Sequence, residues 1–220
     1  MLSKELLSRS LLAVYKEMLY NDSSQANNKL KEEIWEISQD RTIYSDAEIE
    51  QNASELQKIE TISKYKVFMC EIDGAVKVQY ENAIEKTGKQ IQAASSFVIK
   101  SGEELIMENF FPIAPLYGET DTNSHIAEFQ ALVSCLRVLS IYHPNPEMID
   151  VIIHSDSEVL TKQINLESRV RDAARQNLRD EALEYSKCFK TVKVIYFPRE
   201  ENERADLLAK MSRDHKSWTY

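Results

Sequence analysis

The sequence predicts an α/β protein in which a mixed β-sheet is flanked by helices and preceded by an all-α N-terminal segment. Two observations lead to this prediction. No strand-like alternation occurs before Tyr65, whereas β-rich runs and amphipathic runs follow one another after it. Their order is three strands, a helix, a strand, one or two helices, a strand and a helix, which is typical of a mixed sheet with helices on its faces.

The N-terminal segment, residues 1–64, reads as helical throughout. Its first run places apolar residues three and four positions apart, and a second run covers residues 29–39. Ser45 or Asp46 can cap a third helix. The segment has eight Lys or Arg against twelve Asp or Glu, so its net charge is −4. We expect a helical module that docks a protein partner or self-associates, because its short amphipathic runs bury only a thin core alone.

The first part of the sheet is predicted as an antiparallel meander of three β-rich runs, at residues 65–72, 91–100 and 103–113. The dipeptide Ser101-Gly102 supplies a hairpin turn between the second and third runs. Asp73-Gly74, a common turn dipeptide, indicates that the first strand ends there.

The second part begins with the amphipathic helix that contains Glu128 and stops near Tyr142, because Pro144 follows. The remaining predicted elements are strand 149–155, helices 157–165 and 170–189, strand 191–197 and helix 200–213. The predicted domains are therefore a helical module at 1–64, an α/β domain at 65–213 and a C-terminal tail at 214–220.

The overall charge is acidic, −9 from 27 basic and 36 acidic residues, which disfavours a protein that binds nucleic acid through a broad basic face. Carboxylate sites that bind Mg²⁺ or Mn²⁺ are an exception, because the ion reverses the local charge. Charged residues interrupt the apolar N-terminal run, so we expect a soluble, cytoplasmic protein without a membrane segment. The three cysteines lack metal-ligand spacing and lie in apolar runs, which indicates buried thiols: Cys70, Cys135 and Cys188.

Four carboxylates stand out by their local frames: Asp73 after a strand, Glu128 in a helix, Asp156 at a strand-to-helix junction and Asp206 in the last helix. Each has a structural explanation when taken singly, as a turn, a cap or a solvated face. Glu128 is the exception, because it lies at the edge of a buried apolar arc and needs a partner there. Together, four converging acids can hold two hard divalent cations.

The segments around these acids resemble the type 1 ribonuclease H family over about residues 65–213: IDGA, AEFQAL, HSDSEVLTKQI and FPREENERADLLAKM. The resemblance implies a five-stranded ribonuclease H sheet and hydrolysis of the RNA strand of RNA–DNA hybrids. It also implies that Asp73, Glu128, Asp156 and Asp206 hold two Mg²⁺ (or Mn²⁺) ions. One ion would activate a water, and the other would stabilise the leaving 3′ oxygen.

The same resemblance indicates five further residues as candidates for contact with nucleic acid: Asn123, Ser124, Ser157, Arg199 and Asn202. Two departures from the family pattern stand out. An extra residue separates Thr122 from Glu128, and Arg199 occupies the loop in which many members carry a mobile histidine.

Two other functions fit the sequence. One is a nonhydrolytic scaffold of the same fold that binds partners through its N-terminal helices. The other is a different nuclease of the superfold, such as an exonuclease or a junction resolvase. A glutamate on the first helix after a three-strand meander favours ribonuclease H, and four retained acids favour an enzyme.

Overall fold

The computed structural model describes residues 45–82, 87–113 and 124–214, together with residues 32, 34–36, 38 and 39. The chain forms two compact units. One comprises residues 1–66 and 139–146, and the other comprises residues 67–138 and 147–220. The first predicted helix and part of the second lie outside the described residues.

The first unit contains helix α3, Asp46–Ser63. Its N-terminus is closed by a reciprocal capping box. The backbone N–H of Glu48 donates to the Ser45 hydroxyl (3.4 Å), and the Ser45 N–H donates to the Glu48 carboxylate (2.8 Å). Leu56, Ile59 and Ile62 are buried along one side of the helix. The predicted cap at Ser45 is therefore confirmed.

The second unit is built on a five-stranded mixed sheet in the order β3-β2-β1-β4-β5. The β1–β2 and β2–β3 pairs are antiparallel, whereas β1–β4 and β4–β5 are parallel. This arrangement confirms the predicted fold class. The strands are β1 Val67–Asn82, β2 Thr87–Ser101, β3 Glu104–Ile113, β4 Asp150–Ser155 and β5 Thr191–Tyr196.

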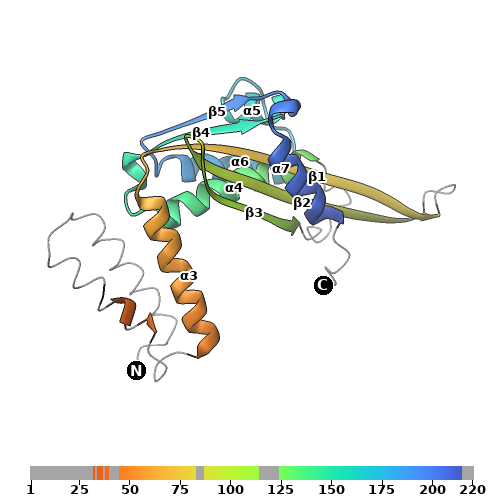
Figure 1. The fold of residues 1–220 in the computed structure, drawn as a ribbon. Helices are drawn as coiled ribbons and strands as arrows, with labels where there is room; N and C mark the ends of the chain where they lie inside the picture. The colour runs from red at the N-terminus through yellow and green to blue at the C-terminus, as the bar shows by residue number, and fades with distance from the viewer. Residues whose placement is uncertain are drawn as a thin grey trace. The chain divides into compact units, whose positions relative to one another are not determined.

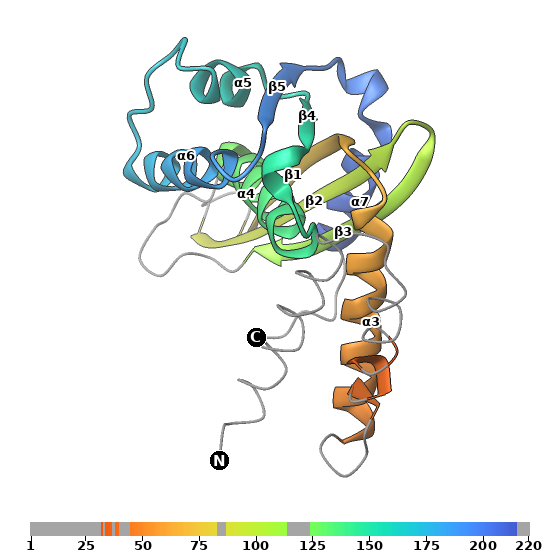
Figure 2. The ribbon, with the colours of Figure 1, turned by 90° about the vertical axis from the view of Figure 1, so that its left-hand side faces the viewer.

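Helices α4 and α6 lie on one face of this sheet, and α7 crosses the other face (Figure 1, Figure 2). The apolar arc of α4 is buried, with Phe129, Leu132 and Leu136 fully inaccessible to solvent. None of the helices in the described part of the chain is both long and apolar enough to span a membrane. The elements are α4 Ser124–Tyr142, η1 Pro146–Met148, α5 Glu158–Ile164, α6 Ala173–Ser186, η2 Arg199–Glu201 and α7 Glu203–Asp214.

The first hairpin differs from the prediction. Strand β1 does not end at Asp73-Gly74 but continues to Asn82, which pairs with Thr87. Asp73 and Gly74 lie in mid-strand, opposite Ser96 and Ser95 of β2. The sequence after Gly74, AVKVQYEN, alternates apolar and polar residues, and this period of two outweighs the local turn preference of Asp-Gly. The predicted turn at Asp73-Gly74 is therefore wrong.

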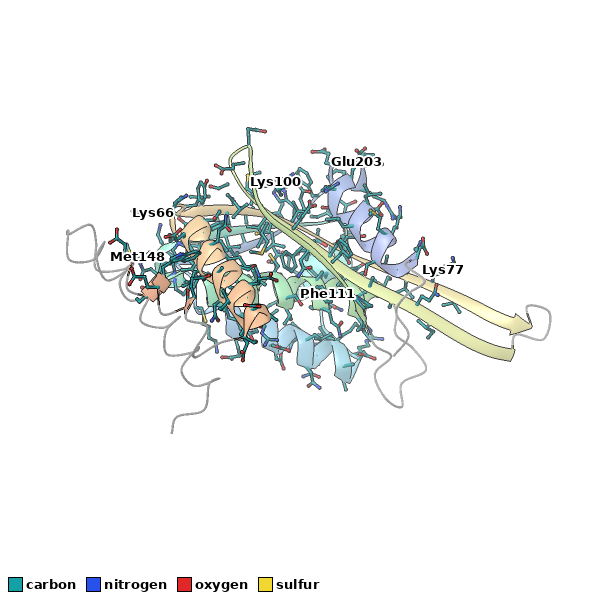
Figure 3. All side chains as sticks on the ribbon, turned by 60° about the horizontal axis from the view of Figure 1, so that its bottom comes forward. Lys66, Lys77, Lys100, Phe111, Met148 and Glu203 are labelled. Carbon is teal, nitrogen blue, oxygen red and sulfur yellow. The ribbon has the colours of Figure 1, made fainter. Side chains whose placement is uncertain are left out.

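The hairpin projects beyond the rest of the sheet (Figure 1), because β3 pairs with β2 only from Ala93 onward and β4 pairs with β1 only up to Ile72. Lys77 lies near the C-terminal end of α7 (Figure 3), and its Nζ is 3.6 Å from Asp214 Oδ1. At the other end of β2 the predicted turn is confirmed, since Gly102 adopts a φ of 58° between β2 and β3.

The cysteines follow the prediction only in part. Cys70 and Cys135 are buried, but Cys188 is exposed. Helix α6 ends at Ser186, so Cys188 falls in the turn before β5 and not in a buried helical turn.

Candidate active site

Asp73 and Asp156 meet at one edge of the sheet. In the parallel β1–β4 pair the last registered partners are Ile72 and Ser155, so each aspartate is the next residue along its strand. Their carboxyl groups are joined by a hydrogen bond. Burial and the neighbouring charge of Asp156 raise the pKa of Asp73 to about 7. Asp73 therefore keeps its proton up to about pH 7.

Glu128 joins this pair from the first turns of α4, and it is only 9 % exposed. Burial raises its pKa, whereas a hydrogen bond from the Ser157 hydroxyl and the nearby His125 ring oppose the rise. His125 Nδ1 lies 3.3 Å from Glu128 Oε2. The carboxylate also adds to the negative potential at Asp73. Glu128 therefore belongs to the same electrostatic cluster as the two aspartates.

Gly74 allows α4 to reach β1. A β-carbon at this position would lie 2.4 Å from the Glu128 backbone nitrogen and 2.5 Å from the Ala127 carbonyl carbon. Only a residue without a side chain permits this approach of helix backbone to strand backbone. Gly74 is thus required to bring Glu128 beside Asp73.

Asp206 enters from the first turn of α7, and its carboxylate is held by two cations. Arg199 Nη2 lies 2.5 Å from Asp206 Oδ1, and Lys210 Nζ lies 2.5 Å from Oδ2. Burial alone would raise the pKa of Asp206, but these two hydrogen-bonded ion pairs outweigh it and lower the pKa. Arg199 Nε also lies 4.0 Å from Asp156 Oδ2. The cluster therefore contains three acids with a raised pKa and one acid that is already neutralised.

Two consecutive serines of β2 connect the sheet to both helices that carry an acid. The Ser95 hydroxyl donates to the Ala127 carbonyl (2.6 Å), directly before Glu128 in α4. The Ser96 hydroxyl donates to the Ala205 carbonyl (2.6 Å), directly before Asp206 in α7. Both serines are fully buried. Because neighbouring residues of a strand face opposite sides, the pair reaches one helix on each face of the sheet.

The predicted substrate-contact residues fall into different environments. Asn202 is fully buried, and its Nδ2 donates to the Ile72 carbonyl (2.9 Å), so a predicted contact with nucleic acid gives way to a structural role beside Asp73. Ser157 is buried too, where it caps α5 by accepting from the Leu160 N–H (3.3 Å) and supports Glu128. Ser124 and Arg199 are exposed, and Asn123 lies outside the described residues.

The donor set suits a hard divalent cation, because all four acids offer only oxygen ligands. Burial and mutual repulsion raise the pKa of Asp73, Asp156 and Glu128. A bound divalent cation would offset the repulsion between these carboxylates when they are ionised. In the described part of the chain, no three acidic, histidine or cysteine side chains form a preformed metal-binding group. The ion pairs at Asp206 give one physical reason why no such group forms, since both oxygens of this carboxylate already face cations.

Sequence reasoning missed four residues that build this site: Gly74, Ser95, Ser96 and Lys210. The serines carried a signal, because two adjacent polar residues interrupt the apolar strand sequence AASSFVI. A buried hydroxyl needs a partner, and here each partner is a helix carbonyl.

Comparisons with known proteins agree with this architecture. The sequence profile of a family described as reverse transcriptase-like matches residues 115–212. The structure is similar to ribonuclease H1 from the archaeon Halobacterium salinarum, with a TM-score of 0.54 and 23 % identity over 67 % of this chain and 98 % of that chain. The chain has a ribonuclease H-like fold. The fold resemblance expected from the sequence is thereby confirmed.

Two further ribonuclease H structures support the same fold. The N-terminal ribonuclease H domain of a Mycobacterium tuberculosis protein has a TM-score of 0.55 and 17 % identity over 68 % of this chain and 95 % of that chain. LC11-RNase H1, solved with an RNA/DNA hybrid, has a TM-score of 0.54 and 19 % identity over 67 % of this chain and 96 % of that chain. A search of curated proteins found no match.

Proposed function

We propose that this ribonuclease H-like domain is a metal-dependent endonuclease that hydrolyses the RNA strand of RNA–DNA hybrids. The observation that carries the proposal is the convergence of Asp73, Glu128, Asp156 and Asp206 into one charge cluster, from the middle of β1, the end of β4 and two helices. The choice of substrate is supported by the fold and by LC11-RNase H1, a protein of that fold whose structure contains an RNA/DNA hybrid.

The four acids would hold two Mg²⁺ or Mn²⁺ ions, which supply positive charge to a phosphodiester that is otherwise repelled. The protein contributes the placement of the acids. Gly74 seats Glu128, the Asn202 amide holds the β1 backbone at Ile72, and the two β2 serines hold α4 and α7. These contacts fix the backbone that carries the acids before charge develops in the reaction.

A second candidate function is a nonhydrolytic scaffold of the same fold. The observation that favours it is the neutralisation of Asp206 by Arg199 and Lys210, which leaves this carboxylate without need of a metal. The two candidates differ in one measurable property, the hydrolysis of nucleic acid.

The deciding experiment incubates the full-length protein with labelled RNA–DNA hybrid, duplex RNA, duplex DNA and single strands, each with Mg²⁺, Mn²⁺ or excess chelator. We expect cleavage of the RNA strand of the hybrid with either metal, leaving 5′-phosphate ends. Cleavage that persists in chelator would contradict the metal mechanism. Intact substrates under every condition would contradict the nuclease and place the scaffold first.

The acids themselves are tested by Asp73→Asn and Asp156→Asn, which keep side-chain shape but remove negative charge. We expect each variant to fold and to lose at least about 100-fold in cleavage rate, as for removal of a group that stabilises transition-state charge. The matched control is Asp150→Asn. Asp150 is the first residue of β4, whereas Asp156 directly follows its last residue, and Asp150 Oδ2 pairs with Lys190 at 2.9 Å. This control should cleave like the parent.

A further inference from the structure

Arg199 lies where a cation shared by two of the acids would lie. It extends from the short turn η2 and bridges the sheet and α7, with its Nη2 2.5 Å from Asp206 Oδ1 and its Nε 4.0 Å from Asp156 Oδ2. A metal ion that links the same two carboxylates would meet this guanidinium, because both occupy the region of lowest potential between the acids.

Lys210 plays a different part. It lies one turn after Asp206 on the same helix, an i,i+4 pair of the kind that stabilises helices locally, and it contacts the other carboxylate oxygen, Oδ2. Within the described residues it forms no ion pair with Asp156. Among the described residues, Arg199 is therefore the cation that hydrogen-bonds to Oδ1 of Asp206.

The Arg199 side chain is able to leave, since 62 % of its surface is exposed, whereas the Asp206 side chain is only 15 % exposed. An exposed arginine loses little free energy when water replaces its carboxylate partner. A phosphate of bound nucleic acid could also replace the carboxylate, because the planar guanidinium binds both groups through paired hydrogen bonds. A buried carboxylate, by contrast, keeps its need for a positive partner.

We propose that Arg199 is an internal competitor of the divalent cation at Asp206: it neutralises the carboxylate in the metal-free protein and must withdraw before an ion uses Oδ1. This role rests on the proposed metal-dependent function, and it makes Arg199 a residue that sets metal affinity. The ion thereby takes the place of the arginine, so Asp206 Oδ1 faces a positive partner in both states.

Arg204 provides a matched control. It is another arginine of the same region, in the first turn of α7, but its guanidinium forms a two-pronged hydrogen bond with Glu108 of β3. Replacement of either arginine by glutamine removes one positive charge. Only replacement of Arg199 frees an oxygen of Asp206.

The experiment measures Mn²⁺ binding to the full-length protein by electron paramagnetic resonance of the free ion, without nucleic acid. The variants are Arg199→Gln, Arg204→Gln, Asp206→Asn and the double variant Arg199→Gln/Asp206→Asn. We expect Arg199→Gln to bind Mn²⁺ about five- to tenfold more tightly than the parent, because a competing charge within contact distance is gone. Arg204→Gln should change the affinity by less than about twofold.

The double variant tests whether the effect passes through Asp206. We expect the gain from Arg199→Gln to vanish in the Asp206→Asn background, because coupled residues show non-additive effects. Equal affinities for Arg199→Gln and Arg204→Gln would overturn the proposal, as would a gain that survives in the double variant. In both cases Mn²⁺ still binds, so the metal-dependent function stands. An absence of Mn²⁺ binding in every variant would overturn both.

Discussion

The backbone nitrogen of Glu128 lies 2.4 Å from the point where a β-carbon on Gly74 would sit. Helix α4 therefore rests on the backbone of β1 directly beside Asp73, and the acid-bearing turn is as close to the strand as a glycine permits. The neighbouring contacts are equally tight, with the Ala127 carbonyl carbon at 2.5 Å.

Gly74→Ala should consequently displace α4. We expect a loss of about 1–3 kcal/mol in the free energy of unfolding, the typical range for overpacking, together with loss of hybrid cleavage. Urea denaturation and the cleavage assay measure the two effects. Gly102→Ala is the control, because its φ of 58° costs about 1 kcal/mol in a turn remote from the acids. Parent-like stability and activity of Gly74→Ala would refute the close approach.

The β2 serines give a second prediction. Ser96→Ala and Ser95→Ala each remove a buried hydroxyl that donates to a helix carbonyl, so each should cost about 1–2 kcal/mol of stability and reduce the cleavage rate. Ser101→Ala removes a similar hydroxyl-to-backbone bond, from Ser101 to the Val67 carbonyl at 2.9 Å, but near the other end of the strand. That variant should keep its activity. If all three variants lost cleavage in proportion to stability alone, the serines would have no positioning role.

The titration of Asp73 predicts how stability depends on pH. The folded protein holds the Asp73 proton up to about pH 7, whereas the unfolded chain releases it near 3.8, so the folded state binds more protons in this interval. In chelator, the free energy of unfolding should therefore fall as pH rises from about 4 to about 7, by on the order of a few kcal/mol. Asp73→Asn should flatten this slope and melt higher than the parent at pH 7.5.

Urea titrations at several pH values measure the slope. Glu103→Gln, in the exposed turn between β2 and β3, is the control and should retain the parent's slope. A parent protein whose stability rises between pH 5 and 7 would show that the Asp73 carboxyl is not held protonated.

The N-terminal module leads to a fourth prediction. Residues 1–64 carry a net charge of −4, which repels phosphates, so their removal should leave hybrid affinity within about twofold of the parent at fixed salt. We expect a changed oligomeric state, solubility or partner interaction instead. A hybrid-binding titration and light scattering on both proteins measure these effects. A large loss of hybrid affinity with unchanged mass would assign the segment to substrate binding.

The elements of the second unit were predictable because each has a strong periodic signal. The α4 apolar arc, the β4 run and the proline after the helix all act locally, and the structure places the elements close to the predicted bounds. The prediction of a turn at Asp73-Gly74 was wrong because tertiary pairing decides the conformation there. Pairing with Ser96 and Ser95 across β2 holds the dipeptide extended, and a single sequence does not reveal the length of that partner strand.

The four acids of the candidate site could be predicted from the sequence, but the residues that contact them could not. Each acid sits at a recognisable junction of elements, but the cation that faces Asp206 depends on the path of η2 and on a long side chain. The role of Asn202 likewise depends on which carbonyl lies beside it after folding, here that of Ile72. That hydrogen bond joins residues 130 positions apart, beyond the range of local patterns.

The register between β1 and β2 decides whether a folded chain has an intact candidate site. Asp73 faces Ser96 and Gly74 faces Ser95, so one register sets the acid, the open space for α4 and the two helix contacts at once. A slip of one residue would turn every side chain to the opposite face and bring a β-carbon under α4. Misaligned chains would then lose the β2 serine contacts to both α4 and α7. The specific activity of a refolded sample would therefore report the fraction of molecules in which β1 and β2 are correctly aligned.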